Sequence, residues 1–105
     1  LGMGVGKIAA QVSHATLGAY RDACTSNSDA VRAWSECGEP TIVLQVGSLA
    51  ELDALLAAAR ARGLVAHSVS DAGRTEVEAG TKTVGCVGPG RVSEVDAVCR
   101  HLSLL

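Results

Sequence analysis

The sequence predicts an α/β fold in three layers (α/β/α), with a small mixed β-sheet flanked by helices on both faces. Apolar runs of strand length alternate along the chain with segments whose apolar residues recur at helical spacing. This alternation is typical of helices layered on a sheet. The 105 residues allow one domain with a modest core, and the 48% of apolar residues include no Phe, so we expect an aliphatic core.

The first predicted helix covers residues 6–23. Its core-facing stripe consists of Ile8, Val12, Ala15 and Ala19. A second stripe with the same spacing consists of Lys7, Gln11, His14 and Gly18. Lys7 follows a glycine-rich turn at the start of the helix, where the positive end of the helix dipole makes a cation unfavourable. Such an exception often marks a functional site, and the alternative is that this stripe is a solvated face.

Two helices and one strand are predicted in the middle of the chain. A short helix over residues 30–37 ends at Gly38. The nearly continuous apolar run TIVLQV, residues 41–46, predicts an interior strand covered on both faces. Ser48 and Glu51 form a capping box at the start of the next helix.

The last third of the chain predicts two strands and a helix. Gly63 ends the preceding helix, and residues 64–70 and 83–88 read as strands. Residues 92–102 carry the apolar stripe of a final helix. The polar, glycine-punctuated segment 71–83 lies between the two strands, and loops of this kind often carry the chemistry of α/β proteins.

Several common site types are excluded by spacing. The glycines before Lys7 fit neither the P-loop nor the dinucleotide-binding pattern, and no nucleophile elbow is present. The four cysteines lack C-x-x-C spacing, which favours reduced packing thiols over a metal site or disulfides, so we expect no metal and no cofactor.

The charge and hydropathy of the chain restrict its partners. A net charge of −2 argues against indiscriminate polyanion binding but leaves room for a local basic patch. No apolar run is as long as a membrane span and no signal-peptide pattern starts the sequence, so we expect a soluble, cytoplasmic protein without membrane contact from this segment. An organelle signal or anchor further upstream stays open.

Two groups of polar residues remain as candidates for chemistry. One is the helix stripe with Lys7, Gln11 and His14, and the other is a loop group consisting of Asp71, Arg74, Thr75 and Thr83. An aspartate can hold or deprotonate water, a lysine can stabilise an oxyanion, and hydroxyls can orient both. Taken singly, each residue also has a structural interpretation, such as an Asx turn at Asp71.

Three stretches, GMGVGKIAAQVSHA, DAGRTEVEAGTKTV, and VGPG followed by VDAVCRHLSLL, closely resemble the peptidyl-tRNA hydrolases of the archaeal and eukaryotic type. The resemblance covers nearly the whole chain in the family's order. It implies hydrolysis of the ester that joins peptide to tRNA, a metal-free reaction and a homodimer. It also implies catalytic roles for Lys7, Asp71, Thr75 and Thr83, and substrate-binding roles for Gln11, His14, Arg74 and Lys82. Lys7 is expected within salt-bridge or one-water reach of Asp71.

The chain departs from the family pattern at a few positions. Val5 replaces a usual lysine, and Gly85 and Cys86 replace a leucine and a glycine. Family members carry a β-strand before the position of Leu1, so residues 1–105 are expected to form a single domain of this type lacking that strand. The alternative function is a catalytically impaired or non-catalytic tRNA- or protein-binding module on the same fold, and turnover of peptidyl-tRNA distinguishes the two.

Overall fold

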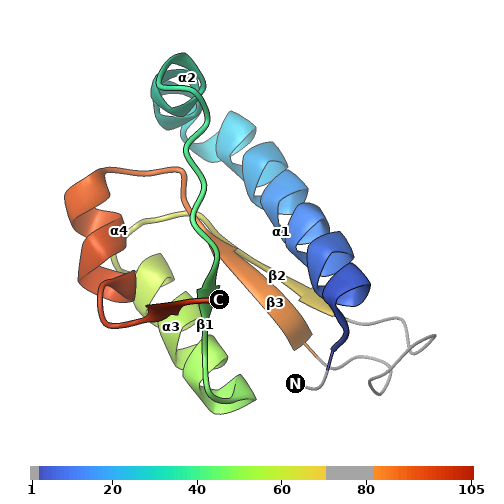
Figure 1. The fold of residues 1–105 in the computed structure, drawn as a ribbon. Coiled ribbons are helices and arrows are strands. Elements are labelled where there is room, and N and C mark those ends of the chain that lie inside the picture. The colour runs from blue at the N-terminus through green and yellow to red at the C-terminus, as the bar shows by residue number, and fades with distance from the viewer. Residues whose placement is uncertain (1–2, 71–81) are drawn as a thin grey trace.

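The α/β prediction is confirmed by the computed structural model, which describes residues 3–70 and 82–105. The elements in chain order are α1 (Val5–Ser26), α2 (Ser28–Glu36), β1 (Leu44–Gln45), α3 (Leu49–Ala61), β2 (Ala66–Ser70), β3 (Lys82–Val87), α4 (Val92–Cys99) and β4 (Ser103–Leu104). Helices α1 and α3 lie on opposite faces of the β2–β3 ladder (Figure 1). They form the outer layers of the α/β/α arrangement.

The strands form two ladders of two strands each, β1–β4 and β2–β3. Both ladders are antiparallel in the described part of the chain, whereas the sequence predicted a mixed sheet. Strands β2 and β3 are consecutive, and a simple reversal of the chain places such strands antiparallel, while a parallel pair needs a long crossover. Strand β4 was not predicted, because the final helix ends at Cys99 rather than continuing to Leu102.

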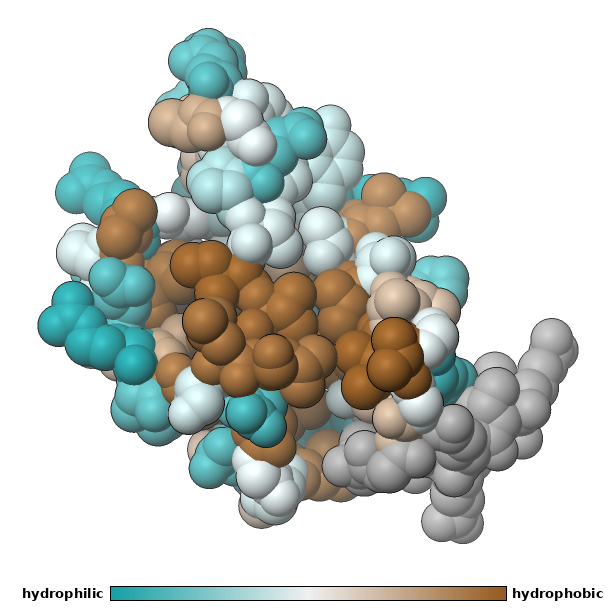
Figure 2. Space-filling view, in the orientation of Figure 1, coloured by the Kyte–Doolittle hydropathy of each residue, from teal (hydrophilic) through white to brown (hydrophobic). Residues whose placement is uncertain are grey.

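The prediction for residues 41–46 is wrong. Only Leu44 and Gln45 join a ladder, and Ile42 is 73% exposed instead of covered. Figure 2 shows an apolar area over β1 and the C-terminal end, whose exposed apolar residues include Val43, Leu104 and Leu105. A continuous apolar run reports hydrophobicity alone, whereas burial of both faces requires neighbours that this segment lacks among the described residues.

The capping signals of α3 are confirmed. The Ser48 hydroxyl accepts a hydrogen bond from the Glu51 N–H at 3.1 Å, and the Glu51 carboxylate accepts one from the Gly47 N–H. Gly63, at φ +76°, follows the helix end in the left-handed conformation that glycine adopts at low cost. The helix therefore begins and ends where the sequence predicted.

The core is aliphatic, as expected. Its buried apolar side chains come from one stripe of α1, one stripe of α3 and the end of α4, and they are Ala15, Ala19, Ala23, Leu52, Leu56, Ala59 and Val98. The small alanines let α1 approach β2 and β3 closely. A Cβ on Gly85 would lie 2.9 Å from Leu56 Cδ2, so α3 packs closely against the sheet at this glycine. None of the described helices is both long and apolar enough to span a bilayer.

Candidate functional site

The candidate site lies at one end of the β2–β3 ladder. The start of α1, the end of β2 and the start of β3 meet there (Figure 1). Ser70 and Lys82 are partners in the ladder, so the chain leaves β2 and enters β3 at this same end. Five predicted site residues are described, namely Lys7, Gln11, His14, Lys82 and Thr83. Asp71, Arg74 and Thr75 lie outside the described residues, so the expected approach of Lys7 to Asp71 stays a prediction.

A buried hydrogen-bond chain joins α1 to both strands. The Gln11 amide nitrogen donates to Thr83 Oγ1 at 2.9 Å, and the Thr83 hydroxyl donates to the Val69 carbonyl oxygen at 3.3 Å. Gln11 is 5% exposed and Thr83 8%, and they are the buried polar residues of the described chain. Gln11 therefore does not belong to a solvated helix face. The structure brings two predicted site residues, 72 positions apart in sequence, into direct contact.

A β-bulge in β3 turns the Thr83 side chain toward α1. Val69 pairs with Val84 while Ser70 pairs with Lys82, so Thr83 is an extra residue in β3 at this step. Gly85 faces Leu56 of α3, and strict alternation along a strand would turn Thr83, two positions earlier, toward α3 as well. The bulge reverses the side of the strand on which Thr83 lies, a frequent device next to active sites. The sequence contains no clear signal for this bulge.

Lys82 lies on the other side of the ladder. Its ammonium nitrogen is 2.8 Å from Asp53 Oδ1 on α3, and both side chains are nearly half exposed. The sequence predicted Lys82 as a phosphate ligand but gave Asp53 no role. A lysine already paired with a carboxylate has less attraction for a second anion, because the two charges largely cancel at a distance.

Lys7 lies in the first turn of α1 and is half-buried. This first turn contains no acidic residue, and its N-cap, Gly4, supplies no side-chain cap. The first turn of a helix contains backbone N–H groups without hydrogen-bond partners inside the helix, and such a helix end together with a cation favours an anion.

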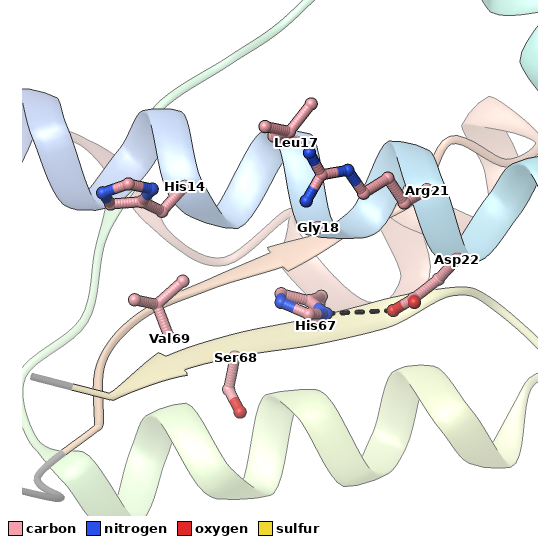
Figure 3. A pocket seen from close by; sticks show the side chains of 8 residues that line it. All are labelled: His14, Leu17, Gly18, Arg21, Asp22, His67, Ser68 and Val69. Carbon is pink, nitrogen blue, oxygen red and sulfur yellow. Dashed lines mark hydrogen bonds and ion pairs between the residues drawn. The ribbon is translucent and has the colours of Figure 1, made fainter.

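His14 is exposed on α1 and lines a cleft of about 370 Å³ between this helix and β2. Leu17 and Arg21 continue the α1 wall, and Val69 forms part of the floor next to the Thr83 hydrogen bond. Figure 3 shows His67 and Val69 pointing from β2 toward α1, whereas Ser68 points to the opposite face. The cleft therefore runs from beside the buried hydrogen-bond chain along α1 as far as Asp22.

The far end of the cleft holds a histidine–aspartate contact that was not predicted from the sequence. His67 Nδ1 is 2.9 Å from Asp22 Oδ2, and the imidazole lies directly against Gly18 (Figure 3). A Cβ at position 18 would collide with the ring. The available signals were a histidine inside a strand of apolar character and a glycine inside a helix, which often indicates close packing.

The other titratable groups support no second centre. Within residues 3–70 and 82–105, no three His, Cys, Asp or Glu side chains are placed to hold a metal ion. Burial, with a smaller contribution from Cys99, raises the pKa of the Cys86 thiol, which is typical of a packing residue rather than a reactive one.

Comparisons with known proteins agree on one family. The family described as "Peptidyl-tRNA hydrolase PTH2" matches residues 1–105. A human protein named "Peptidyl-tRNA hydrolase 2, mitochondrial" is 41% identical over 104 residues, covering 99% of this chain and 58% of the human protein. A Drosophila melanogaster protein, "Probable peptidyl-tRNA hydrolase 2", is 44% identical over 105 residues, covering 100% of this chain and 56% of the fly protein.

The match to an archaeal relative covers a larger share of that relative's length. A Halobacterium salinarum protein named "Peptidyl-tRNA hydrolase" is 43% identical over 104 residues, which are 99% of this chain and 90% of that protein. The chain therefore spans just over half the length of the two animal relatives and most of the archaeal one. The family resemblance inferred from the three motifs is confirmed.

Proposed function

The chain belongs to the PTH2 family of peptidyl-tRNA hydrolases, and on this premise we propose that it hydrolyses the ester bond between peptide and tRNA in peptidyl-tRNA. The observation that carries the proposal is the buried contact between Gln11 and Thr83 at the end of the ladder where residues 71–81 join β2 to β3. A hydroxyl held there by two protein groups is preorganised before any substrate arrives.

The two hydrogen bonds of the Thr83 hydroxyl restrict the role that it can take in catalysis. A hydroxyl has one proton and two acceptor lone pairs. Its proton is donated to the Val69 carbonyl and one lone pair accepts from Gln11, so one lone pair remains for an outside donor. A water molecule can donate to it, and we assign Thr83 to orienting the attacking water. Gln11 becomes a positioning residue that acts through Thr83 rather than a direct substrate contact.

The other catalytic assignments follow from the resemblance and the chemistry of each group. Asp71 positions or deprotonates the water, and Thr75 hydrogen-bonds water or substrate. Lys7, with the N–H groups at the start of α1, stabilises the oxyanion of the tetrahedral intermediate. Removal of a cation from a helix N-terminus relieves an unfavourable dipole interaction, so Lys7→Ala should reduce turnover but have little effect on thermal stability.

Recognition of the tRNA is assigned to local basic groups because the net charge is −2. His14, Arg74 and Lys82 are the proposed contacts to the acceptor end, and Lys82 must first leave Asp53. Affinity for tRNA should therefore fall steeply as salt rises, since bound phosphates release counterions. We further propose that the protein is cytoplasmic and forms a homodimer; the exposed apolar residues around Ile42 and Leu104 support the homodimer.

Turnover of peptidyl-tRNA tests the proposal directly. The wild-type protein should release free tRNA and peptide, and Asp71→Asn should reduce the rate about a hundredfold while leaving the melting temperature unchanged. Asp29→Asn, an exposed change in the first turn of α2, is the matched control and should retain full activity. Absence of turnover in a wild-type protein that still binds tRNA would refute the hydrolase assignment.

A further inference from the structure

The cleft between α1 and β2 contains a cation, Arg21, at the end away from Thr83. Arg21 is exposed, and its guanidinium forms no hydrogen bond or ion pair with another residue of the described part of the chain. Its side chain extends back along α1 toward Leu17, which places the charge beside the cleft (Figure 3). A guanidinium with unused donors is suited to an oxyanion that can accept two parallel hydrogen bonds.

The neighbouring carboxylate is held away from Arg21. Asp22 accepts a hydrogen bond from the His67 ring at 2.9 Å, so its carboxylate points toward β2, while the Arg21 side chain runs along α1 toward Leu17 (Figure 3). His67 is itself wedged beneath Gly18, where any side chain would displace the ring. His67 thus holds the Asp22 carboxylate at β2. Without this contact, the carboxylate would weaken anion binding next to Arg21.

The length of the cleft indicates which part of the substrate reaches Arg21. Gln11 and Arg21 are ten residues apart on one helix, and at about 1.5 Å per residue they are separated by about 15 Å. Stacked nucleotides rise about 3.4 Å each, so this distance corresponds to about four nucleotides. Every nucleotide carries a phosphate, whereas a peptide backbone is uncharged, so a lone guanidinium beside the cleft favours the RNA.

We propose that Arg21 binds a backbone phosphate within about four nucleotides of the 3′ end of the substrate tRNA, and that the Asp22–His67 pair keeps this subsite free of a competing carboxylate. The inference rests on the proposed function for the identity of the RNA. It adds a phosphate subsite outside the motifs that carry the family resemblance.

The first test measures binding of deacylated tRNA by Arg21→Gln over a range of salt concentrations. We expect affinity about threefold to tenfold weaker at low salt, and a log–log salt slope smaller by about 0.7, the value for one lost phosphate contact to a single strand. Arg32→Gln on α2, another exposed arginine, is the matched control and should behave as wild type. An Arg21→Gln protein that binds like wild type overturns the proposal.

The second test locates the phosphate. With tRNA shortened by its four 3′-terminal nucleotides, wild type and Arg21→Gln should bind equally, because the contact is missing in both. An equal loss of affinity for shortened and full-length tRNA would show that Arg21 binds elsewhere on the RNA, and the proposal would fall.

The third test examines the contact between His67 and Asp22. His67→Leu removes the partner of Asp22 and should weaken tRNA binding a few-fold, and adding Asp22→Asn should restore it. Failure of Asp22→Asn to restore binding would remove the role given to the pair. These measurements use deacylated tRNA, so they are independent of turnover: a protein that binds through Arg21 without hydrolysing peptidyl-tRNA refutes the proposed function and leaves this subsite standing.

Discussion

The hydrogen bond between Gln11 and Thr83 predicts a specific pattern of unfolding free energies in a double-mutant cycle. Thr83→Val keeps the shape of the side chain but leaves the buried Gln11 amide without its acceptor. An unsatisfied buried polar group costs about 1–3 kcal/mol. Gln11→Leu removes the donor but leaves the Thr83 hydroxyl bonded to Val69, so its cost should be lower, about 1 kcal/mol.

The double variant should lose less than the sum of the two single variants. When both partners become apolar, no polar group of the pair is left buried and unsatisfied, and such paired replacements are often nearly neutral. We therefore expect a coupling free energy of about 1–2 kcal/mol. For a domain of this size, 1 kcal/mol corresponds to a shift in Tm of about 4–8 °C.

The assay is equilibrium urea unfolding of the four proteins, with turnover of peptidyl-tRNA measured in parallel. Thr16→Val is the control, because the Thr16 hydroxyl bonds only to Val12 within α1, and it should leave turnover unchanged. Both site variants should lower turnover, since each changes the orientation or presence of the Thr83 hydroxyl. Additivity of the two single variants within about 0.5 kcal/mol would contradict the coupling inferred from the structure.

Three further predictions concern other contacts. Asp53→Asn should cost at most about 1 kcal/mol of stability, because the pair is exposed, and should increase tRNA affinity only while Lys82 is present, as a binding assay in a Lys82→Ala background would show. Gly18→Ala should lower Tm despite the better helix propensity of alanine, because the added methyl displaces His67; an unchanged or higher Tm would contradict that packing. Cys86 should react with thiol reagents at mildly alkaline pH more slowly than the two exposed cysteines, because burial raises the pKa of its thiol. The folded state therefore favours the protonated thiol of Cys86. The contribution of this thiol to stability is full below the ordinary thiol pKa and declines as the pH rises above that value. Equal labelling of all the cysteines in the folded protein would contradict the burial.

Local patterns in the sequence were sufficient for most elements. The box at Ser48 and the glycine at position 63 bounded α3, because capping depends on groups within a few residues of each other. The apolar stripe predicted for the first helix is confirmed at Ala15 and Ala19, but Gln11 is also buried although the pattern placed it on a separate polar stripe. Periodicity identifies a helix, but whether a polar residue of that helix can be buried depends on the hydrogen-bond partners that the neighbouring strands provide.

The candidate site depended on tertiary structure to a greater degree. The motifs singled out Gln11 and Thr83, but the β-bulge decided that they touch, since one extra residue changes the side on which Thr83 lies. The pairs Lys82–Asp53 and His67–Asp22 each join two elements far apart in the chain, and no local signal shows which residue is the partner of which. The sequence alone determined the helices, the family and the chemically capable residues, because these depend on local spacing and motif order. The tertiary structure decided which charges are already paired and which side of the sheet each group occupies, because strand pairing and close helix–sheet packing act between segments that the sequence keeps apart.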